Sequence, residues 1–562
     1  MNEAAGASGY RHLSKKGAAW SLGQRNAEAV YRQHIGRREI VLDRARELAE
    51  LTIPSLVPPD GYQEGDKLYV PFQDIGSRCL NNLASKISLT ILPPNRSPFR
   101  HMQPDELVDM FRKDAEQLQV KVEEIKSKTD LALSKREQMA KGRMETTAIR
   151  MVLGEAIKQL LVAGNVLYRH QDLDYPQVHR MDSYIVKRNN KGEPLLTILE
   201  EKVSYVDLDE DVRKAVDDYP SAEKDGREEW ERTVKIYTVC KKQGDWWYTW
   251  QEVRGGYVID GTEAKDPKDS PPLWPSWMIP MYGSNWGRSY ADEYYSGFLA
   301  AENYSKALQE GAIAAAWTLF FTKPGSRTRP KQLKEARNLD VLVGSAEDIT
   351  TMKLEKGYDF QLVTNALEAV ERRLGFAFLL NSATQRAGER VTAEEIRLMA
   401  RELDTAMGGI YAALAQNLQK TVIHRFLSLM EKEGVLPKLP DFGKASIKIS
   451  IVTGIDALGR SYDDQLLDET IGEAANLFGP EAVAQRINVS EYFRRKAAAK
   501  AIDPEGLVRT EEEVAAEQQQ NQMQQLTQSV APGVAQEGVK GMVNALMSQR
   551  QAEMQPPPTS EG

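Results

Sequence analysis

The chain has 562 residues, of which 41% are hydrophobic and 27% are charged, and its formal net charge is −8. This length exceeds the size at which one hydrophobic core keeps growing, so we expect several domains. The acidic balance argues against a protein that grips nucleic acid through its whole surface, because such proteins carry a basic excess. Any contact with DNA must therefore be local.

Cysteine content and hydropathy indicate the redox compartment of the protein and whether it spans a membrane. Cys79 and Cys240 are too far apart in sequence to form a metal knuckle or a redox pair, so we expect a reduced compartment. The first twenty residues contain no apolar segment, so we expect no secretory signal. The longest strongly apolar run, 312–321, is about half of the roughly 20 residues that a membrane-spanning helix needs. We expect a soluble protein.

The first part of the chain has helical periodicity. Pro93 and Pro94 should end the second helix, because proline cannot continue a helix. Gly164 and Asn165 should stop or bend the third. The predicted helices are 20–52, 72–92 and most of 104–170.

Strand-like composition follows. Segments rich in β-branched and aromatic residues, separated by glycine-containing turns, predict antiparallel strands. The aromatic run WWYTW (246–250) suits base stacking, but in a strand the favoured interpretation is that its rings face a core. The proline-rich stretch 269–283 should be an extended connector. The predicted strands are 194–208, 233–240, 246–253 and 256–259.

A helix rich in small residues should begin at Ser289 and run for nearly thirty residues. Because small side chains let helices approach closely, we expect it to pack against neighbouring helices. A compact insert, 322–359, follows it and is basic at its start. Helix should resume at about Phe360 and run to Leu380.

A short basic loop follows this second helix. The loop precedes Thr392, which stands three residues before a glutamate and so matches a capping box at the start of the next helix. The arginines suit either a solvated loop or a phosphate contact, and Arg390 could instead pair with Glu394 or Glu395. The candidate loop residues are Gln385, Arg386, Gly388 and Arg390.

The longest periodic helix starts after this loop. Apolar residues at three- and four-residue steps form one stripe from Ile396 to Phe426. Gly408 and Gly409 interrupt the stripe, which predicts a kink there. Beyond it we expect a strand at 444–454, short helices over 464–509 and a loosely ordered tail rich in glutamine and proline.

Catalytic signatures are absent from the sequence. It contains no G-x-x-x-x-G-K-[ST] loop, H-E-x-x-H helix or G-x-S-x-G elbow. The six histidines have no ligand spacing, so we expect neither a metal nor another cofactor. The acidic run DLDED (207–211) resembles the start of a calcium loop, but Val212 replaces the required glycine, and a helix cap is favoured.

Six blocks of the sequence stand out together: LTIPSLVPP (51–59), GSRCLNNLASKISL (76–89), KQLLVAGNVLY (158–168), GRSYADEYYSGFLAAEN (287–303), FAFLLNSATQRAGERVTAEEIR (376–397) and TGIDALGR (453–460). All six resemble sequences of one protein family, the head-to-tail connectors or portal proteins of short-tailed double-stranded DNA phages. The blocks contain no catalytic motif that convergent evolution could explain, so their occurrence together is a specific signal.

The resemblance implies an α+β, mostly helical portal fold with wing, stem, clip and crown, assembled as a ring of twelve copies around a central DNA channel. Carried onto this chain, the loop at 381–391 becomes a tunnel loop in the channel. The implied divisions are an α+β wing region (1–288), a first stem helix (289–316), a clip (317–359), a second stem helix (360–380), the tunnel loop, a long kinked wing helix with a returning strand (392–463), crown helices (464–510) and a tail (511–562).

The resemblance also implies a structural function. The ring would sit at one capsid vertex of the virion, after assembly in the host cytoplasm, where it nucleates the head, docks the packaging motor, passes DNA in and out, and attaches the tail. Its implied partners are double-stranded DNA, the terminase large subunit, the major capsid and scaffolding proteins, tail adaptor proteins and internal core proteins. The implied clip contacts are Arg327, Arg329, Lys331, Lys334 and Arg337.

Net charge is consistent with a channel. Twelve copies at −8 each would carry roughly −96, and a like-charged ring favours sliding of DNA over binding. Two alternatives stay open. One is another structural tail or minor capsid component, and the other is a DNA-packaging enzyme, against which the missing phosphate loop counts.

Overall fold

The computed structural model describes most of the chain between residues 20 and 380 and parts of the remainder. The described ranges are 20–23, 25–63, 65–93, 97–102, 122–217, 228–253, 255–316, 319–325, 329–337, 340–341, 345–352, 357–380, 409–436, 448–451 and 459–479, together with Leu403, Thr405, Met407 and Tyr492.

The chain divides into two compact units, which are described separately. The first contains residues 1–110 and 135–459, and the second contains 111–134 and 460–562. The long helix α4 (Val122–Thr146) has residues in both units. The sequence suggested no association of the segment 111–134 with the C-terminal part of the chain.

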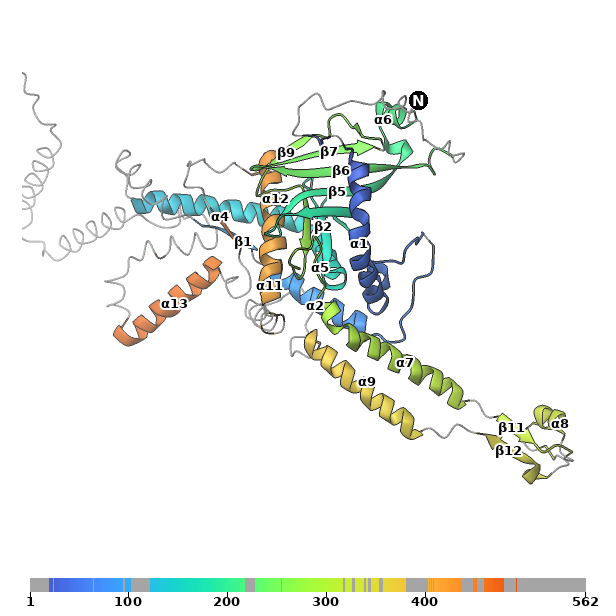
Figure 1. Ribbon diagram of the computed structural model, residues 1–562. Helices are drawn as coiled ribbons and strands as arrows, with labels where there is room; N and C mark the ends of the chain where they lie inside the picture. The colour runs from blue at the N-terminus through green and yellow to red at the C-terminus, as the bar shows by residue number, and fades with distance from the viewer. Residues whose placement is uncertain are drawn as a thin grey trace, which may run out of the picture. The chain divides into compact units, whose positions relative to one another are not determined.

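A six-stranded antiparallel sheet lies in the first unit (Figure 1). Short connections join most successive strands, but residues 205–232, which include α6 (Glu210–Asp217), lie between β5 and β6. Gln243 pairs with Trp246, which leaves a two-residue hairpin, and Gly244 has the positive φ of 61° that the first position of a type II′ turn requires. The strands are β4 (Tyr184–Arg188), β5 (Pro194–Ser204), β6 (Thr233–Gln243), β7 (Trp246–Val253), β8 (Tyr257–Val258) and β9 (Ala264–Pro267).

Both faces of this sheet are covered. Trp247 and Trp250 are three residues apart on β7, so their side chains point to opposite faces, and both are buried. Trp247 belongs to the main core, whereas Trp250 packs with Val30 and Tyr31 of α1 (Ala27–Glu50) in a second cluster. The aromatic run is therefore core, as the favoured interpretation had it, although Trp246 is 41% exposed.

A glutamate of the sheet holds the start of α1. Glu252 accepts a hydrogen bond from the Ala27 backbone N–H at 2.7 Å and another from the Trp250 indole at 2.7 Å. Burial raises the pKa of Glu252, and these two bonds act in the opposite direction. The first free N–H groups of a helix favour an anionic acceptor, so this contact orients α1 on the sheet.

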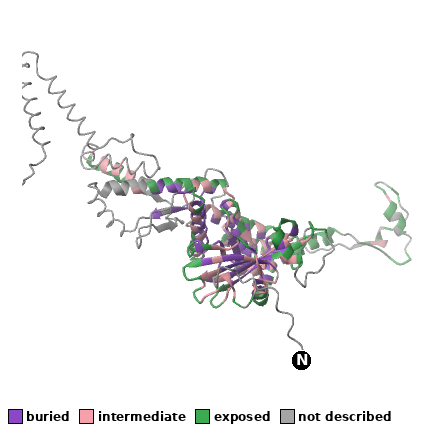
Figure 2. Cartoon of the chain, turned by 90° about the horizontal axis from the view of Figure 1, so that it is seen from above, coloured by how far each residue is buried: buried purple, intermediate pink, exposed green. Residues whose placement is uncertain are grey.

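The main core lies between a three-stranded sheet and several helices, where buried residues concentrate (Figure 2). The helix stop predicted at Gly164 is confirmed, because Gly164 ends α5 in the left-handed conformation with φ 71°. The residues that follow it, expected to be largely helical as far as 170, instead form the strand β2 from Asn165. The elements are α2 (Ile75–Ile91), α5 (Ile149–Ala163), β2 (Asn165–Arg169), β3 (Gln177–His179), β10 (Leu273–Trp277) and α12 (Lys420–Lys432).

The proline-rich segment contains a strand as well as extended connections. β10 pairs with β2 at the edge of its sheet, and Pro275 lies opposite Leu167. An edge position tolerates proline, because the missing N–H faces no partner strand.

The late part of the first unit contains a helix with a π-helical turn. Residues Ala415–Gln419 are π-helical between α11 (Gly409–Leu414) and α12. In this turn the Gln419 amide donates to the Ile91 carbonyl at 2.7 Å.

The returning strand β13 (Lys448–Ile451) pairs antiparallel with β1 (Phe99–Met102).

Two helices run side by side and antiparallel, with a small insert between them in sequence (Figure 1). The turn Ala291–Tyr294 precedes the first of them. The elements of this region are α7 (Tyr295–Ala316), β11 (Leu319–Thr322), α8 (Pro330–Glu335), β12 (Ile349–Met352) and α9 (Gly357–Ala377).

The remaining elements are short or belong to the second unit. They are the short helices Pro54–Leu56, Met181–Ser183, Tyr205–Asp207 and Ala346–Asp348, with α6 (Glu210–Asp217) and α13 (Gly459–Phe478).

Membrane spans and metal clusters are absent from the described residues. Among them, no helix is long and apolar enough to cross a membrane, and no group of three potential ligands is placed to hold a metal ion. Both cysteines are buried, and burial raises the pKa of each thiol to about 12.

Candidate functional site

The turn between α5 and β2 is fitted against the segment that leads into α7. A Cβ at Gly164 would lie 2.5 Å from the Arg288 carbonyl carbon and 2.5 Å from the Ser289 nitrogen. Next to this contact, the Asn165 amide donates to the Gly287 carbonyl and accepts from the Gly287 N–H, both at 2.8 Å. Two blocks that the sequence analysis singled out, 158–168 and 287–303, therefore meet in space.

The block at 51–59 joins the same region. The Gln159 amide of α5 donates to the Leu56 carbonyl at 2.9 Å. Gln73 donates to the Leu51 carbonyl at 2.7 Å and accepts from the Gly76 N–H at 2.8 Å. These buried side chains replace water as partners of backbone groups, so the loop keeps its backbone hydrogen bonds without regular secondary structure.

The extended segment before α2 is attached to α7 by a buried glutamate. Glu302 accepts from the Tyr69 hydroxyl at 2.6 Å and from the Phe72 N–H at 3.0 Å, and it is 5% exposed. The hydrogen bond to Glu302, together with burial, raises the pKa of Tyr69 to about 12. Gln309, two turns further along α7, donates to the Phe72 carbonyl at 3.0 Å. Helix α7 is thereby fixed, as far as Gln309, to the extended segment before α2.

Glycines set the distance between α7 and α9. A Cβ at Gly297 would lie 3.1 Å from Leu374 Cδ2, and a Cβ at Gly311 would overlap the ring of Phe360. The close approach expected from the small residues of this helix is therefore confirmed for these two positions. Just after α9, Phe378 lies in an aromatic cluster, and its ring centroid is 5.4 Å from that of Phe298 and 5.3 Å from that of Tyr290.

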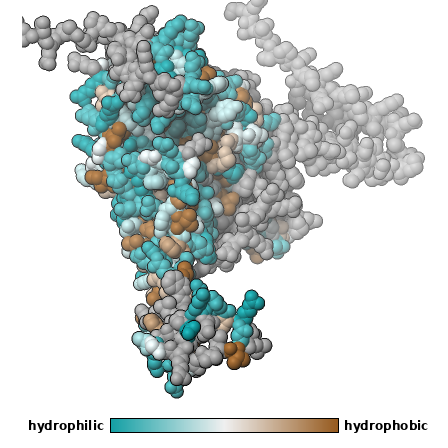
Figure 3. Space-filling view, turned by 90° about the vertical axis from the view of Figure 1, so that its right-hand side faces the viewer, coloured by the Kyte–Doolittle hydropathy of each residue, from teal (hydrophilic) through white to brown (hydrophobic). Residues whose placement is uncertain are grey.

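Several large hydrophobic side chains of this helix pair are exposed. The last five residues of α7 are all exposed as well. One face of the molecule is mainly hydrophilic, with hydrophobic residues scattered over it (Figure 3). The uncovered side chains are Leu299 (38%), Ile313 (61%), Tyr358 (81%), Leu362 (61%) and Phe376 (66%).

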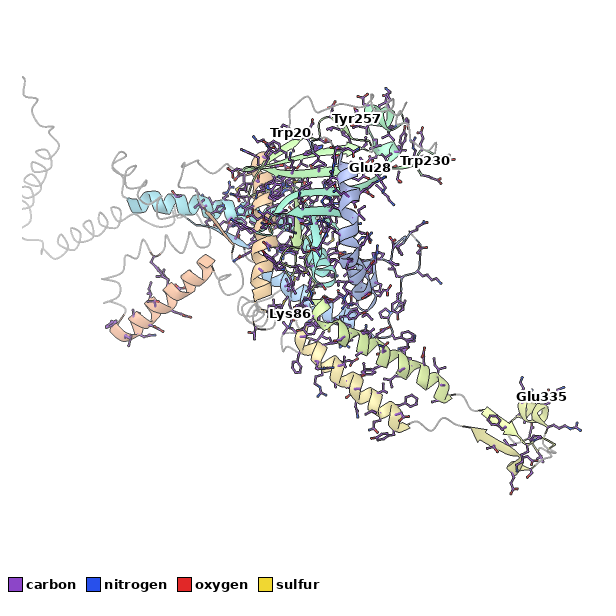
Figure 4. The ribbon with its side chains drawn as sticks, in the orientation of Figure 1. Trp20, Glu28, Lys86, Trp230, Tyr257 and Glu335 are labelled. Atoms are coloured by element: carbon purple, nitrogen blue, oxygen red, sulfur yellow. The ribbon has the colours of Figure 1, made fainter. Side chains whose placement is uncertain are left out.

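The basic insert between α7 and α9 is built on a two-stranded ladder. β11 and β12 pair antiparallel, from Leu319 opposite Met352 to Thr322 opposite Ile349. Helix α8, which carries Glu335, follows β11 (Figure 4). Of the candidate clip residues, Arg327 lies outside the described residues. The other four, all exposed, are Arg329, Lys331, Lys334 and Arg337.

The candidate loop and kink are only partly described. Gln385, Arg386, Gly388 and Arg390 lie outside the described residues, as does Gly408. Gly409 begins α11, and the irregular turn that the structure describes is the π-helical one at Ala415–Gln419. The glycine kink and the arginine loop therefore stay predictions.

Comparison with known proteins now assigns the class. The family profile described as "Bacteriophage head to tail connecting protein" matches residues 24–508. The chain belongs to this family of phage head-to-tail connecting proteins.

Its relatives include the portal protein of Escherichia phage T7, 33% identical over 523 residues, which covers 92% of this chain and 94% of the relative. The portal protein of Enterobacteria phage T3 is also 33% identical, over 541 residues, with 95% and 96% covered. The portal protein of Enterobacteria phage SP6 is 28% identical over 513 residues.

Sequence reasoning missed the residues that hold the region together. Glu302 and Gln159 were not singled out, although each lies in a block that resembled the family, and Asn165 was named only as part of a helix stop. A polar residue at an otherwise apolar position of a helix is the available signal. Its partner, a backbone carbonyl or N–H far away in sequence, leaves no pattern.

Proposed function

We propose that this chain is the portal of its phage: a ring at one capsid vertex that nucleates the head, docks the packaging motor, conducts DNA and attaches the tail. The observation that carries the proposal is the match to the head-to-tail connecting family over residues 24–508. The proposed role is structural, and ATP hydrolysis belongs to a separate motor protein.

Ring formation is supported by the uncovered stem, the helix pair α7 and α9. Its exposed hydrophobic residues include Ile313, Leu362 and Phe376. Fully burying one such side chain contributes roughly 1.5–3 kcal/mol, so five per chain supply a substantial driving force for association. A surface used by every copy in the same way fits a closed ring with heterologous contacts. We propose about twelve copies.

The insert supports a docking role for the clip, residues 317–359. Between residues 317 and 337 the sequence carries six basic residues and one acidic residue, in a chain that is acidic overall. Such a local excess attracts an acidic partner surface and sets its approach. We propose that the terminase large subunit during packaging, and tail adaptor proteins afterwards, bind here.

The loop 381–391 is proposed to face the channel and to contact DNA through Arg386 and Arg390. The nearest described support is α9, whose last turns carry the exposed residues Arg372 and Arg373. Guanidinium groups bind phosphate oxygens at any base, so such contacts would carry no sequence preference. The major capsid protein, scaffolding protein and internal core proteins are the further proposed partners, in the virion and, during assembly, in the host cytoplasm.

The test of this function is the assembled state of the purified full-length protein. Native mass spectrometry should give a ring of about twelve chains, and electron microscopy down its axis should show a central opening. Leu362→Lys should prevent the ring, whereas Gln361→Lys, an equal charge change at an exposed polar neighbour, should not. A stable wild-type monomer at micromolar concentration, or ATP hydrolysis by the pure protein, would contradict the proposal.

A further inference from the structure

The helix α9 ends in a left-handed turn that its sequence does not favour. The Leu380 N–H donates to the Gly375 carbonyl at 2.8 Å, and the Leu379 N–H donates to the Phe376 carbonyl at 3.3 Å. These two bonds form a Schellman motif, in which the residue after the helix takes the left-handed conformation. Here that residue is Leu379, with φ 56°.

Leucine is an unusual residue for this position. Glycine normally occupies it, because a Cβ crowds the following carbonyl in the left-handed region. Among the described residues, Leu379 is the one non-glycine residue with a positive φ. Something outside the local sequence must therefore favour this turn.

Two side chains of α2 bind the carbonyls that the turn exposes. The Asn82 amide donates to the Phe378 carbonyl at 3.0 Å and to the Leu379 carbonyl at 2.9 Å. The Lys86 ammonium donates to the Leu379 carbonyl at 3.1 Å and is 4% exposed (Figure 4). A cation at a helix C-terminus also interacts favourably with the helix dipole. Nearby, the Tyr290 hydroxyl donates to the Ala377 carbonyl at 3.1 Å.

The same carbonyls have a second way to be satisfied. If Leu379 took the right-handed helical conformation, α9 would continue, and the next turn of the helix would supply the N–H donors. We infer that Asn82 and Lys86 form a latch that ends α9 at Ala377, and that release of this latch lets the helix continue through Leu379. The position at which α9 ends is thus controlled by α2.

The latch gives the wing a means to act on the segment that begins at residue 381. A change at α2 that withdraws Asn82 and Lys86 would alter the direction in which the chain leaves α9. That this segment is a DNA-contacting loop rests on the proposed function. The latch itself does not depend on it.

The test compares glycine with alanine at position 379 in the full-length protein. At a left-handed helix end glycine is more stable than alanine, whereas inside a helix alanine is more stable than glycine. In the otherwise unchanged protein, Leu379→Gly should melt above Leu379→Ala by roughly 1–3 °C. In the background Asn82→Ala with Lys86→Met, the order should reverse. Asn81→Ala, an exposed neighbour on α2, should leave the order unchanged.

An unreversed order without the latch would overturn the inference, because the turn would then be set locally. If the double background does not fold, Asn82→Ala and Lys86→Met are measured singly. Each single background should narrow the difference in melting temperature between Leu379→Gly and Leu379→Ala. An unaltered difference in both backgrounds would also overturn the inference. These melting temperatures do not involve Arg386 or Arg390, so failure of the channel proposal and failure of the latch are distinguishable.

Discussion

Arg425 of α12 and Asp266 of β9 form an ion pair in the interior, with Nη1 and Oδ1 2.7 Å apart and side chains 3% and 7% exposed. The same guanidinium donates through Nε to the His170 carbonyl at 2.6 Å and through Nη1 to the Ser270 carbonyl at 3.2 Å. One side chain thus joins the late helix α12 to both sheets. The Asp266 carboxylate and the two carbonyl oxygens accept hydrogen bonds from the guanidinium, so the buried charge of Arg425 is tolerated.

Replacing Arg425 should be strongly destabilising. Arg425→Met leaves Asp266 buried without its cation, and loss of one partner of a buried pair costs about 3–5 kcal/mol. Lys432→Met, an exposed lysine on the same helix, should change the free energy of unfolding by less than roughly 0.5 kcal/mol. Thermal or denaturant unfolding of the purified protein measures both. Equal effects of the two variants would show that the pair contributes nothing.

The contact at Gly164 predicts a second sensitive position. Gly164→Ala adds a Cβ in a left-handed conformation and against the backbone of Arg288, so we expect a loss of at least roughly 2 kcal/mol. Gly244→Ala has a similar φ but open space around the added atom, and should cost only about 1 kcal/mol. The difference between the two unfolding free energies measures the clash. Equal losses would mean that the α5–β2 turn moves aside without cost.

Buried histidine predicts that stability falls in weak acid. Burial, and more weakly the charge of Arg425, lower the pKa of His170 to about 4, although a bond to the Leu173 carbonyl opposes this. Its unfolded pKa is about 6.5. Between these values the unfolded chain binds more protons than the folded one, so stability decreases as pH falls from about 6.5 to about 4. The full contribution is roughly 3 kcal/mol.

Measuring the free energy of unfolding between pH 6.5 and pH 4 checks whether stability falls with pH and whether His170 is the cause. His170→Gln should reduce the dependence of the unfolding free energy on pH, even though the variant is less stable at pH 7. Part of the dependence should remain, because burial also lowers the pKa values of His179 and His424. His34→Gln, at a half-buried position on α1, serves as the matched control. An unchanged slope in His170→Gln would assign the acid sensitivity to other groups.

Much of the fold could be predicted because the determining information was local. The strand at 246–253 was predicted with its observed bounds, and the helix predicted at 72–92 is observed at Ile75–Ile91. Composition and proline placement suffice in both cases. Strand β2 was missed because apolar residues continue on both sides of Gly164 and Asn165, and periodicity alone does not separate a short apolar strand from more helix.

The parts that could not be predicted are set by tertiary contacts. Leu379 takes a conformation that leucine disfavours, and bonds from Asn82 and Lys86 accompany it. The π-helical turn before α12 accompanies the bond from Gln419 to the Ile91 carbonyl, a residue 328 positions away. No sequence window contains both partners of such contacts.

Charge reversal on the clip should affect docking but not assembly. The changes are Arg329→Glu with Lys334→Glu, at two exposed positions, so ring formation should be normal. Binding of the motor protein or of tail adaptors should weaken by about tenfold at low salt and by less at high salt, since exposed charges are screened. Lys187→Glu with Lys191→Glu on the wing makes the same change in charge and is the control. Normal packaging and tail attachment in the clip variant would exclude this docking surface.

The two arginines of the loop 381–391 give the last prediction. If Arg386 and Arg390 face the channel in every copy, they form a circle of guanidinium groups within an acidic ring. Each can pair with phosphate as a planar fork, in charge-assisted bonds stronger than neutral ones, and a few such contacts steady DNA without fixing its sequence.

Replacing both arginines with alanine should leave rings intact, while packaged DNA is retained less well or the genome length falls. Replacement with lysine keeps the charge but loses the fork, so it should be intermediate. The competing arrangement pairs Arg390 with Glu394 or Glu395 and stiffens the turn. In that case the alanine variant lowers the melting temperature of the ring, and DNA content stays normal. DNA content per particle and its release on heating separate the two, because only the channel arrangement makes both depend on residues 386 and 390.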